Sequence, residues 1–310
     1  MSAETLVQLD LLSTAARQQS DHFAKRCADL QKERGQFFTP APIARFMASL
    51  LTHLPDDMRI LDPGAGAGML SAAVCERIAS LRSPRRVEIQ AYETDKAVLP
   101  LLARTLAEAR RYLAQRGHAM EFCIHDRDFI LDGPGLPDAD LFGSERFDVA
   151  ILNPPYLKIG KDSRYAVAMA ELVHGQPNLY ALFMALAAYC LKPGAQFVAI
   201  TPRSFCNGPY FRTFRRWILA RLSIQRFHLF ESRTDAFSEA AVLQENVITY
   251  ARRSSEQSPL IRITHSRGRD VPESLTPLDL KASLVIDGED RIIRLPASHA
   301  EVSILSAVES

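Results

Sequence analysis

Short apolar runs alternate with longer stretches of helical periodicity through the first two thirds of the chain. Alternation of this kind is typical of a parallel sheet covered by helices. The helical stretches lie between the earlier runs, and another precedes the last run. Five apolar runs predict buried strands, at residues 59–62, 87–93, 121–126, 147–152 and 195–201.

The ends of this region complete the expected fold. Residues 4–33 read as an amphipathic helix, and Pro42 opens a second helix that continues to Leu51. After a helix at 210–222, two more strands are predicted at 224–230 and 246–251. The gap between these strands is too short for a crossover helix, so the last strand is expected to be antiparallel. The pattern therefore predicts an α/β protein with a mostly parallel seven-stranded sheet, preceded by N-terminal helices.

The texture of the chain changes after Arg253. Residues 254–259 resemble a linker, and residues 260–310 hold short strand-like pieces without an evident core. We expect an N-terminal helical segment at 1–35, a main domain at 36–253, and a linker with the start of a further region at 254–310.

Composition narrows the class of protein. The chain is 47% hydrophobic and 24% charged with a net charge of +1, which neither demands nor excludes a nucleic-acid partner. Its five cysteines are scattered and form no C-x-x-C pair, and no metal-binding cluster is visible among the eight histidines. No signal pattern or membrane-length apolar stretch is present, so we expect a cytoplasmic protein.

Three strand ends carry residues suited to a nucleoside ligand. Residues 61–68 (LDPGAGAG) follow the first strand, and their glycines allow close approach to the backbone, whereas a tight turn without a ligand is the alternative. Glu93 ends the second strand, where an acid typically binds ribose hydroxyls, unless Thr94 or Asp95 simply caps a helix. Asp128 and Phe129 follow the third strand and suit an adenine amine and ring face, although Asp128 suits a turn equally well.

Asn153-Pro154-Pro155-Tyr156 follows the fourth strand and is the most informative feature of the sequence. It combines an amide, two rigid prolines and an aromatic ring at a strand end, where ligand crevices of α/β proteins lie. That combination suits holding a flat, amine-bearing group. A proline-rich turn that ends a strand is the alternative.

Together, these motifs resemble the gamma-class N6-adenine DNA methyltransferases of the TaqI and PstI type, a Rossmann-like class I fold. The resemblance covers residues 33 to about 253 in the family's order, and it includes residues 35–40 (GQFFTP), 178–183 (NLYALF) and 191–194 (LKPG). It implies catalytic roles for Asn153, Pro154 and Tyr156. Residues implied to bind S-adenosyl-L-methionine are Thr39, Asp62, Gly64, Gly66, Glu93, Asp128, Phe129 and Asn153, and those implied to stack on the flipped-out base are Tyr156 and Phe237.

The resemblance also implies partners. Double-stranded DNA is the expected substrate, within a bacterial restriction-modification system that includes a cognate endonuclease and a target-recognition domain or subunit, of which residues 254–310 would be the start. Cationic side chains near the cleft are candidates for phosphate contacts, although a solvated helix face explains the cluster at 212–216 equally well. These candidates are Lys158, Lys161, Arg164, Arg203, Arg212, Arg215 and Arg216. Residues 160–176 are expected to form a long loop beside the active site.

Two other functions share these motifs. Methyltransferases that modify a release-factor glutamine or an rRNA base carry similar Asn-Pro-Pro-Tyr signatures. A non-catalytic or partner-dependent module that binds DNA or S-adenosylmethionine is the other alternative. The 35–40 motif upstream and Phe237 downstream favour DNA adenine among these.

Overall fold

The computed structural model describes residues 11–23, 39–133, 147–170, 178–231, 246–267, 275–298 and 300–303. Its elements in chain order are α1 (Leu11–Phe23), α3 (Ala41–Ser49), β1 (Asp57–Pro63), α4 (Met69–Ala79), β2 (Arg86–Tyr92), α5 (Leu99–Ala114), β3 (Ala119–His125), β4 (Phe147–Leu152), α6 (Arg164–Ala168), α7 (Leu179–Tyr189), β5 (Leu191–Pro202), α8 (Ser204–Asn207), η2 (Pro209–Phe211), α9 (Arg212–Leu219), β6 (Leu222–Glu231), β7 (Asn246–Arg253), β8 (Leu260–Arg267), β9 (Leu278–Lys281), α11 (Ala282–Val285), β10 (Ile286–Asp287) and β11 (Ile292–Ile293).

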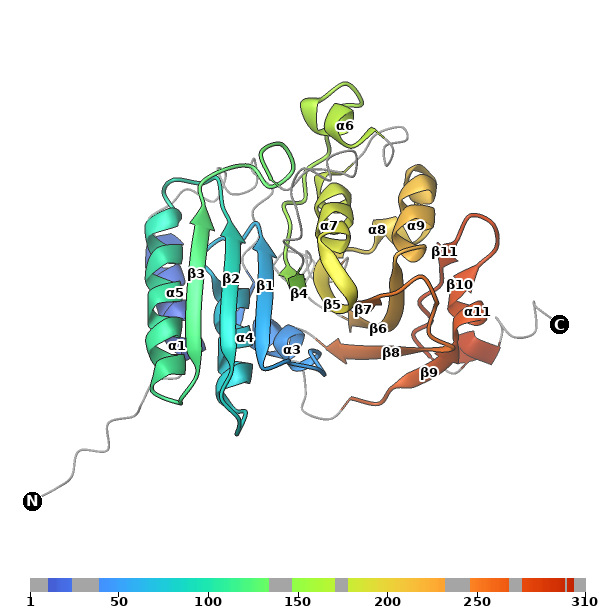
Figure 1. Ribbon diagram of the computed structural model, residues 1–310. Helices are drawn as coiled ribbons and strands as arrows, with labels where there is room; N and C mark the ends of the chain where they lie inside the picture. The colour runs from blue at the N-terminus through green and yellow to red at the C-terminus, as the bar shows by residue number, and fades with distance from the viewer. Residues whose placement is uncertain are drawn as a thin grey trace, which may run out of the picture.

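A single large sheet runs through the molecule in the order β3-β2-β1-β4-β5-β7-β6-β8-β9 (Figure 1). Strands β1 to β5 pair in parallel. Strand β7 runs antiparallel to both of its neighbours, β5 and β6. The predicted mostly parallel sheet with an antiparallel last strand is therefore confirmed for the seven strands that the sequence predicted.

The sheet has two strands more than the predicted seven. Strand β8 pairs in parallel with β6, and β9 pairs antiparallel with β8. The buried side chains of Ile261, Ile263, Leu278 and Leu280 add these strands to the core. Seven strands would have left β6 as an open edge, which proteins usually cover. Residues 254–259 form the loop between β7 and β8, so the sheet continues past Arg253, and a target-recognition region in 254–310 stays a prediction.

Each central strand presents alternate residues to two separate cores. In β4, Ala150 and Leu152 join one core, whereas Val149 and Ile151 join the other. This alternation follows from the two-residue period of a strand. A continuous apolar run is the sequence signature of a strand buried on both faces. Helices α1, α3, α4 and α5 supply the core on one face, and α7, α8 and α9 supply the core on the other.

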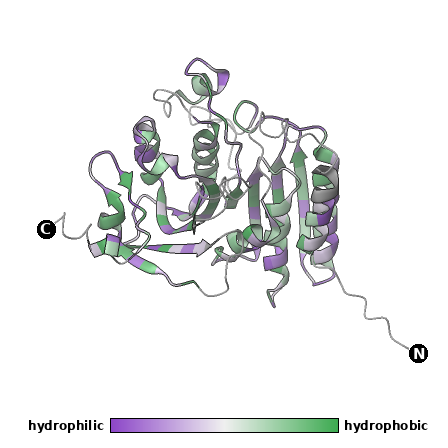
Figure 2. Cartoon of the chain, turned by 180° about the vertical axis from the view of Figure 1, so that it is seen from behind, coloured by the Kyte–Doolittle hydropathy of each residue, from purple (hydrophilic) through white to green (hydrophobic). Residues whose placement is uncertain are grey.

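The two helical layers differ in how far they are buried. Seen from the opposite side, the helices of the first layer carry hydrophilic and hydrophobic residues side by side (Figure 2). Helix α7 instead is buried along almost its whole length, from Leu179 to Ala188. A helix that is apolar all round belongs inside the protein. Helix α7 follows the segment that leaves the carboxyl end of β4. Burial of α7 in the core therefore anchors the far end of that segment.

Both predicted N-terminal helices are present in the described part of the chain, as α1 and α3. Helix α1 packs on the first layer through Leu11, Leu12 and Ala15. Its remaining predicted length, at residues 4–10 and 24–33, lies outside the described residues. Helix α3 begins with Pro42 in its first turn, as predicted, and its buried face includes Ile43 and Met47.

Candidate functional site

The glycine loop after β1 bends back over β2. The backbone N–H groups of Gly64 and Ala65 donate to the carbonyl of Tyr92, at 2.9 and 2.8 Å. Gly64 has φ +74° and Gly68 has φ +83°, values that favour glycine. A Cβ on Gly68 would lie 3.0 Å from Leu102 Cδ1, so this position also lets α4 approach α5. The loop is therefore both a conformational and a packing requirement.

Asp62, just before this loop, is a fully buried acid. Its Oδ2 accepts a 2.6 Å hydrogen bond from Ser71 Oγ on α4. Its Oδ1 is buried and has no hydrogen-bond partner among the described residues. Burial raises the pKa of Asp62 from 3.8 to about 7, because the lost hydration outweighs the Ser71 hydrogen bond. An unpartnered buried carboxylate oxygen suits a cationic or amine-bearing ligand.

Glu93, at the end of β2, joins two strand ends. Its Oε2 accepts from Gly66 N at 2.9 Å, and its Oε1 accepts from Asp95 N at 2.7 Å. Asp95 Oδ1 in turn accepts from Ala97 N at 3.1 Å, in the turn before α5. The N-cap of α5 is Val98 and has no side-chain cap, so the predicted capping role of Asp95 is not found. Burial raises the pKa of Glu93, although these backbone hydrogen bonds lower it. Both carboxylate oxygens of Glu93 therefore bind the backbone of this region.

Asp128 and Phe129, after β3, have different surroundings. Asp128 Oδ1 accepts from the N–H groups of Ile130 and Leu131, at 2.9 and 3.0 Å, which is the turn role that the sequence left open. Asp128 Oδ2 accepts a 2.7 Å hydrogen bond from Tyr165 Oη.

The Phe129 ring is buried in an aromatic cluster. It lies between Tyr92 and Phe183, with ring centroids 5.1 and 5.5 Å away. A Cβ on Gly64 would reach Phe183 and Pro155, at 3.6 and 3.8 Å. The glycine loop, this cluster and the end of β4 therefore adjoin one another.

Asn153, at the end of β4, has its amide fixed from two sides. Its Nδ2 donates to Thr39 Oγ1 at 3.0 Å, and its Oδ1 accepts from Tyr156 Oη at 2.9 Å. Tyr156 Oη also lies 3.1 Å from the carbonyl oxygen of Ile200 on β5. Burial raises the pKa of Tyr156 well above its usual range, so this hydroxyl stays a donor. Thr39, 114 residues earlier in the chain, is thus brought to Asn153. Its predicted contact with the cofactor stays a prediction.

Three aromatic residues of this region were not predicted as site residues. Phe183 faces the Phe129 ring, and the 178–183 motif could have indicated it. The Tyr180 ring packs edge-on against Tyr156, with centroids 6.3 Å apart. Tyr165 contacts Asp128, but a single tyrosine in a polar loop gives no sequence signal for this. The predicted base-stacking residue Phe237 lies outside the described residues, as do residues 35–38.

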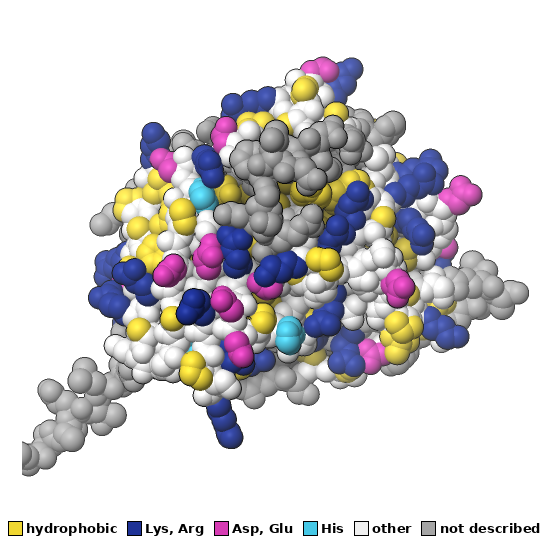
Figure 3. All heavy atoms as spheres, in the orientation of Figure 1, with side chains coloured by type: hydrophobic (Ala, Val, Ile, Leu, Met, Phe, Trp, Pro, Cys, Tyr) yellow, Lys and Arg dark blue, Asp and Glu magenta, His cyan; other side chains and the backbone are white. Residues whose placement is uncertain are grey.

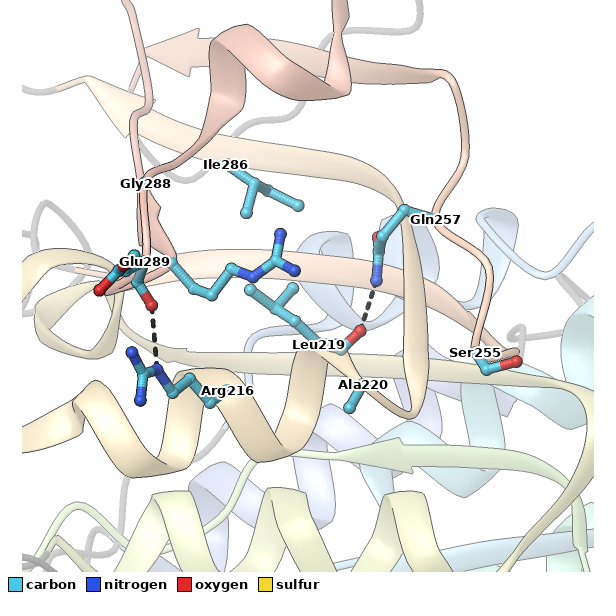
Figure 4. Close-up of a pocket in the computed structure, with 9 residues that line it drawn as sticks. Arg216, Leu219, Ala220, Ser255, Gln257, Ile286, Gly288 and Glu289 are labelled. Carbon is cyan, nitrogen blue, oxygen red and sulfur yellow. Dashed lines mark hydrogen bonds between the residues drawn. The ribbon is translucent and has the colours of Figure 1, made fainter.

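Within the arginine cluster of α9, Arg215 is buried and binds protein, which corrects the predicted choice between DNA and solvent for this residue. Arg212 and Arg216 are exposed and also contact the protein. Arg215 Nη1 donates to the carbonyls of Phe205 and Gly208, at 3.1 and 2.7 Å, and its Nε donates to the carbonyl of Asp290 at 3.1 Å. Arg216 Nε donates to the carbonyl of Glu289 at 2.9 Å (Figure 4).

The third arginine of this cluster, Arg212, forms an ion pair of 2.5 Å with Asp290. The turn between β10 and β11 therefore supplies hydrogen-bond and ion-pair partners to the three arginines of α9. The turn and α9 line a groove of about 870 Å³.

The other predicted phosphate ligands, Lys158, Lys161, Arg164 and Arg203, are exposed. On the face shown in Figure 3, basic side chains lie among acidic ones, in keeping with the small net charge. Within the described residues no group of His, Cys, Asp or Glu could hold a metal ion. None of the helices in that part of the chain is long and apolar enough to span a membrane.

The chain is similar to a protein family and to individual methyltransferases. Residues 104–237 match the Eco57I restriction-modification methylase family. Type II methyltransferase M.BsuBI of Bacillus subtilis is 38% identical over 230 residues, which are 73% of this chain and 45% of that protein. M.PstI of Providencia stuartii is 35% identical over 243 residues, which are 76% and 46% of the two chains. The chain thus spans about half the length of the curated relatives it matches.

A solved structure supports the fold. A Listeria monocytogenes protein described as a class I S-adenosylmethionine-dependent methyltransferase aligns with a TM-score of 0.61 at 17% identity. The alignment covers 83% of this chain and 74% of that one. The predicted class I methyltransferase fold is confirmed.

Proposed function

Since the chain contains a restriction-modification methylase domain related to M.BsuBI and M.PstI, we propose that it methylates adenine in duplex DNA. The methyl group passes from S-adenosyl-L-methionine to the exocyclic N6 amine of a flipped-out base. The observation that carries the proposal is the fixed amide of Asn153, which is held by Thr39 and Tyr156 in a motif whose Pro155 adjoins Gly64.

The residues at the strand ends fit the cofactor. The free Oδ1 of Asp62 suits the ammonium of the methionine end. Glu93, held at the loop by Gly66 N, suits the ribose hydroxyls. Asp128 suits the adenine amine, and the Phe129 and Phe183 rings suit the purine. When bound, S-adenosylmethionine supplies an activated methyl group.

Asn153 and Pro154 would prepare the acceptor. The amine of adenine is a poor nucleophile, because its lone pair is delocalised into the ring. An amide oxygen can accept two hydrogen bonds, and Asn153 Oδ1 and the Pro154 carbonyl are the predicted acceptors. Two hydrogen bonds from the amine to these oxygens favour a tetrahedral nitrogen with a localised lone pair. Pre-oriented acceptors of this kind need no reorganisation during the reaction.

Tyr156 would also hold the flipped base. Extrusion of a base from the duplex costs a few kcal/mol, and stacking on an aromatic ring returns about 1–3 kcal/mol per base. The hydroxyl of Tyr156 is fixed by Asn153 and Ile200, so its ring has one orientation. We propose Phe237 as a second stacking residue on sequence grounds.

Substrate class is the main point to test. The purified chain is incubated with tritium-labelled S-adenosylmethionine and, separately, with unmethylated duplex DNA, rRNA or release factor. Label in DNA, released as N6-methyladenine, is the expected result. Label only in rRNA or in protein would overturn the DNA proposal, and cofactor binding without transfer to any substrate would favour a non-catalytic module.

Further partners follow from the same proposal. M.BsuBI and M.PstI are named as type II methyltransferases, and the chain spans about half of each. We propose that a target-recognition domain or subunit selects the DNA sequence and that a cognate endonuclease cuts the same sequence. Base-edge contacts of such a region would carry the specificity.

Affinity for S-adenosylmethionine is expected to rise with pH up to about 7, where Asp62 titrates, and then to level off. Below this pH the buried carboxyl is protonated, and an approaching ammonium lowers its pKa, so binding releases a proton. Linkage then gives a rise of at most about tenfold per pH unit. Titration calorimetry between pH 5.5 and 8.5 measures the slope.

Asp62→Asn is the control, because it removes the titrating group and keeps a polar side chain. Any pH dependence that remains in this variant belongs to the ligand itself. Equal slopes in the wild type and the variant would show that Asp62 does not meet the cofactor's charge.

A further inference from the structure

The segment that follows the Asn153–Tyr156 motif reaches the end of β3. Its base is held by a 2.8 Å hydrogen bond from Leu179 N to the carbonyl of Leu157. Further along, Ser163 Oγ accepts from Ala166 N at 3.2 Å and caps the short helix α6. Helix α6 stands above the carboxyl ends of the strands, next to the loop after β3 (Figure 1).

This segment is packed against the protein. Ala166 and Met169 are buried, with exposed fractions of 3% and 2%. Tyr165, directly before Ala166, is half-buried against the core that contains Phe129. Its hydroxyl donates to Asp128 Oδ2 at 2.7 Å. Burial, and secondarily Asp128, raise the pKa of Tyr165, which keeps the hydroxyl protonated and able to donate.

Both oxygens of Asp128 are thereby held. Oδ1 accepts two backbone N–H groups, and Oδ2 accepts the Tyr165 hydroxyl. A carboxylate oxygen accepts more than one hydrogen bond, so Oδ2 keeps acceptor capacity for a ligand. Without Tyr165, the plane of the carboxylate would be fixed only from the Oδ1 side.

We infer that Tyr165 is a positioning residue of the cofactor site, whose hydroxyl orients Asp128 toward the 6-amino group of the purine. This inference rests on the proposed function. The chemistry implies selectivity, because a fixed carboxylate accepts from a 6-amino group and repels the lone pairs of a 6-oxo group. The apolar faces of Phe129 and Phe183 do not distinguish the two. Tyr165 therefore confers preference for adenine over hypoxanthine, and it ties the segment after the catalytic motif to the cofactor site.

The test compares two ligands that differ at the purine 6-position. Affinities for S-adenosyl-L-homocysteine and S-inosyl-L-homocysteine are measured by calorimetry with the full chain. Tyr165→Phe is expected to weaken the adenosyl ligand about fivefold, in line with the net contribution of one ordinary hydrogen bond, and to change the inosyl ligand little. The ratio of the two affinities therefore falls. Tyr189→Phe is the matched control, because Tyr189 is partly buried on α7 and packs on the same core, and it leaves the ratio unchanged.

The outcomes distinguish a failure of the proposed function from a failure of the role assigned to Tyr165. If the wild type binds neither ligand, the proposed function fails and this inference fails with it. If the wild type binds and Tyr165→Phe keeps the wild-type ratio, only the inference is overturned. An equal loss for both ligands would show a purely structural role and would also overturn it. In an Asp128→Ala background, Tyr165→Phe is expected to leave the ratio unchanged; a further change there would contradict the coupling.

Discussion

Replacement of Asn153 by Ala is expected to lower the rate of methyl transfer to DNA by about 10² to 10³-fold, as when a pre-oriented polar group is removed from an active site. The side chain supplies the acceptor oxygen for the adenine amine, and Thr39 and Tyr156 hold it in place. Affinity for S-adenosylmethionine is expected to stay within about twofold, because the proposed cofactor contacts lie mainly at the other strand ends. Single-turnover transfer and cofactor titration measure the two quantities separately.

Gln115→Ala provides a matched control for this substitution. Gln115 also carries an amide, but it is exposed. It follows α5 and precedes β3, so it lies toward the amino ends of the parallel strands, whereas Asn153 lies at their carboxyl ends. It is expected to keep the wild-type rate. An Asn153→Ala enzyme with wild-type transfer would remove Asn153 from the mechanism. A parallel loss of cofactor affinity would instead place its main effect on the cofactor site.

Replacement of Arg215 by Ala is expected to lower the free energy of unfolding by about 3 kcal/mol, since buried carbonyls lose a charged donor and a large side chain is deleted. Arg215 is 1% exposed and donates to the carbonyls of Phe205, Gly208 and Asp290. Urea denaturation followed by circular dichroism measures the change.

Arg212→Ala is the neighbouring control. Its ion pair with Asp290 joins side chains that are each 48% exposed. Exposed pairs of this kind contribute about 0–1 kcal/mol, so this variant is expected to stay close to wild type. If Arg215→Ala unfolded like the wild type but bound DNA more weakly, the phosphate role considered from the sequence would be restored.

Local patterns predicted the architecture well. The apolar runs that became β4 and β5 are buried on both faces, so their composition alone identified them as strands. In β2, buried and partly exposed residues alternate instead. Asp62, Glu93, Asp128 and Asn153 each follow an apolar run. Because parallel strands bring their carboxyl ends to one edge, the sequence also indicated that these side chains lie together.

Contacts between distant segments could not be predicted in the same way. The hydrogen bond from Asn153 to Thr39 joins residues 114 positions apart, and no periodicity contains it. Family resemblance implied only that the Thr39 motif meets the methionine end of the cofactor. The helix pattern of Arg212–Arg216 shows a charged face, but it does not say whether that face meets water, DNA or the turn at 288–291. Strands β8 and β9 were missed for a related reason, because short apolar runs do not reveal their pairing partners.

The sequence by itself determined the succession of the first seven strands and their helices along the chain, and the chemistry at the strand ends, because both depend on local composition and spacing. Only the tertiary structure decided which partner each polar group has. It placed Tyr165 on Asp128, Tyr156 on Asn153 and Arg215 on three backbone carbonyls. The reason is physical: buried polar groups must find hydrogen-bond partners, and packing of the whole chain determines which ones are within reach.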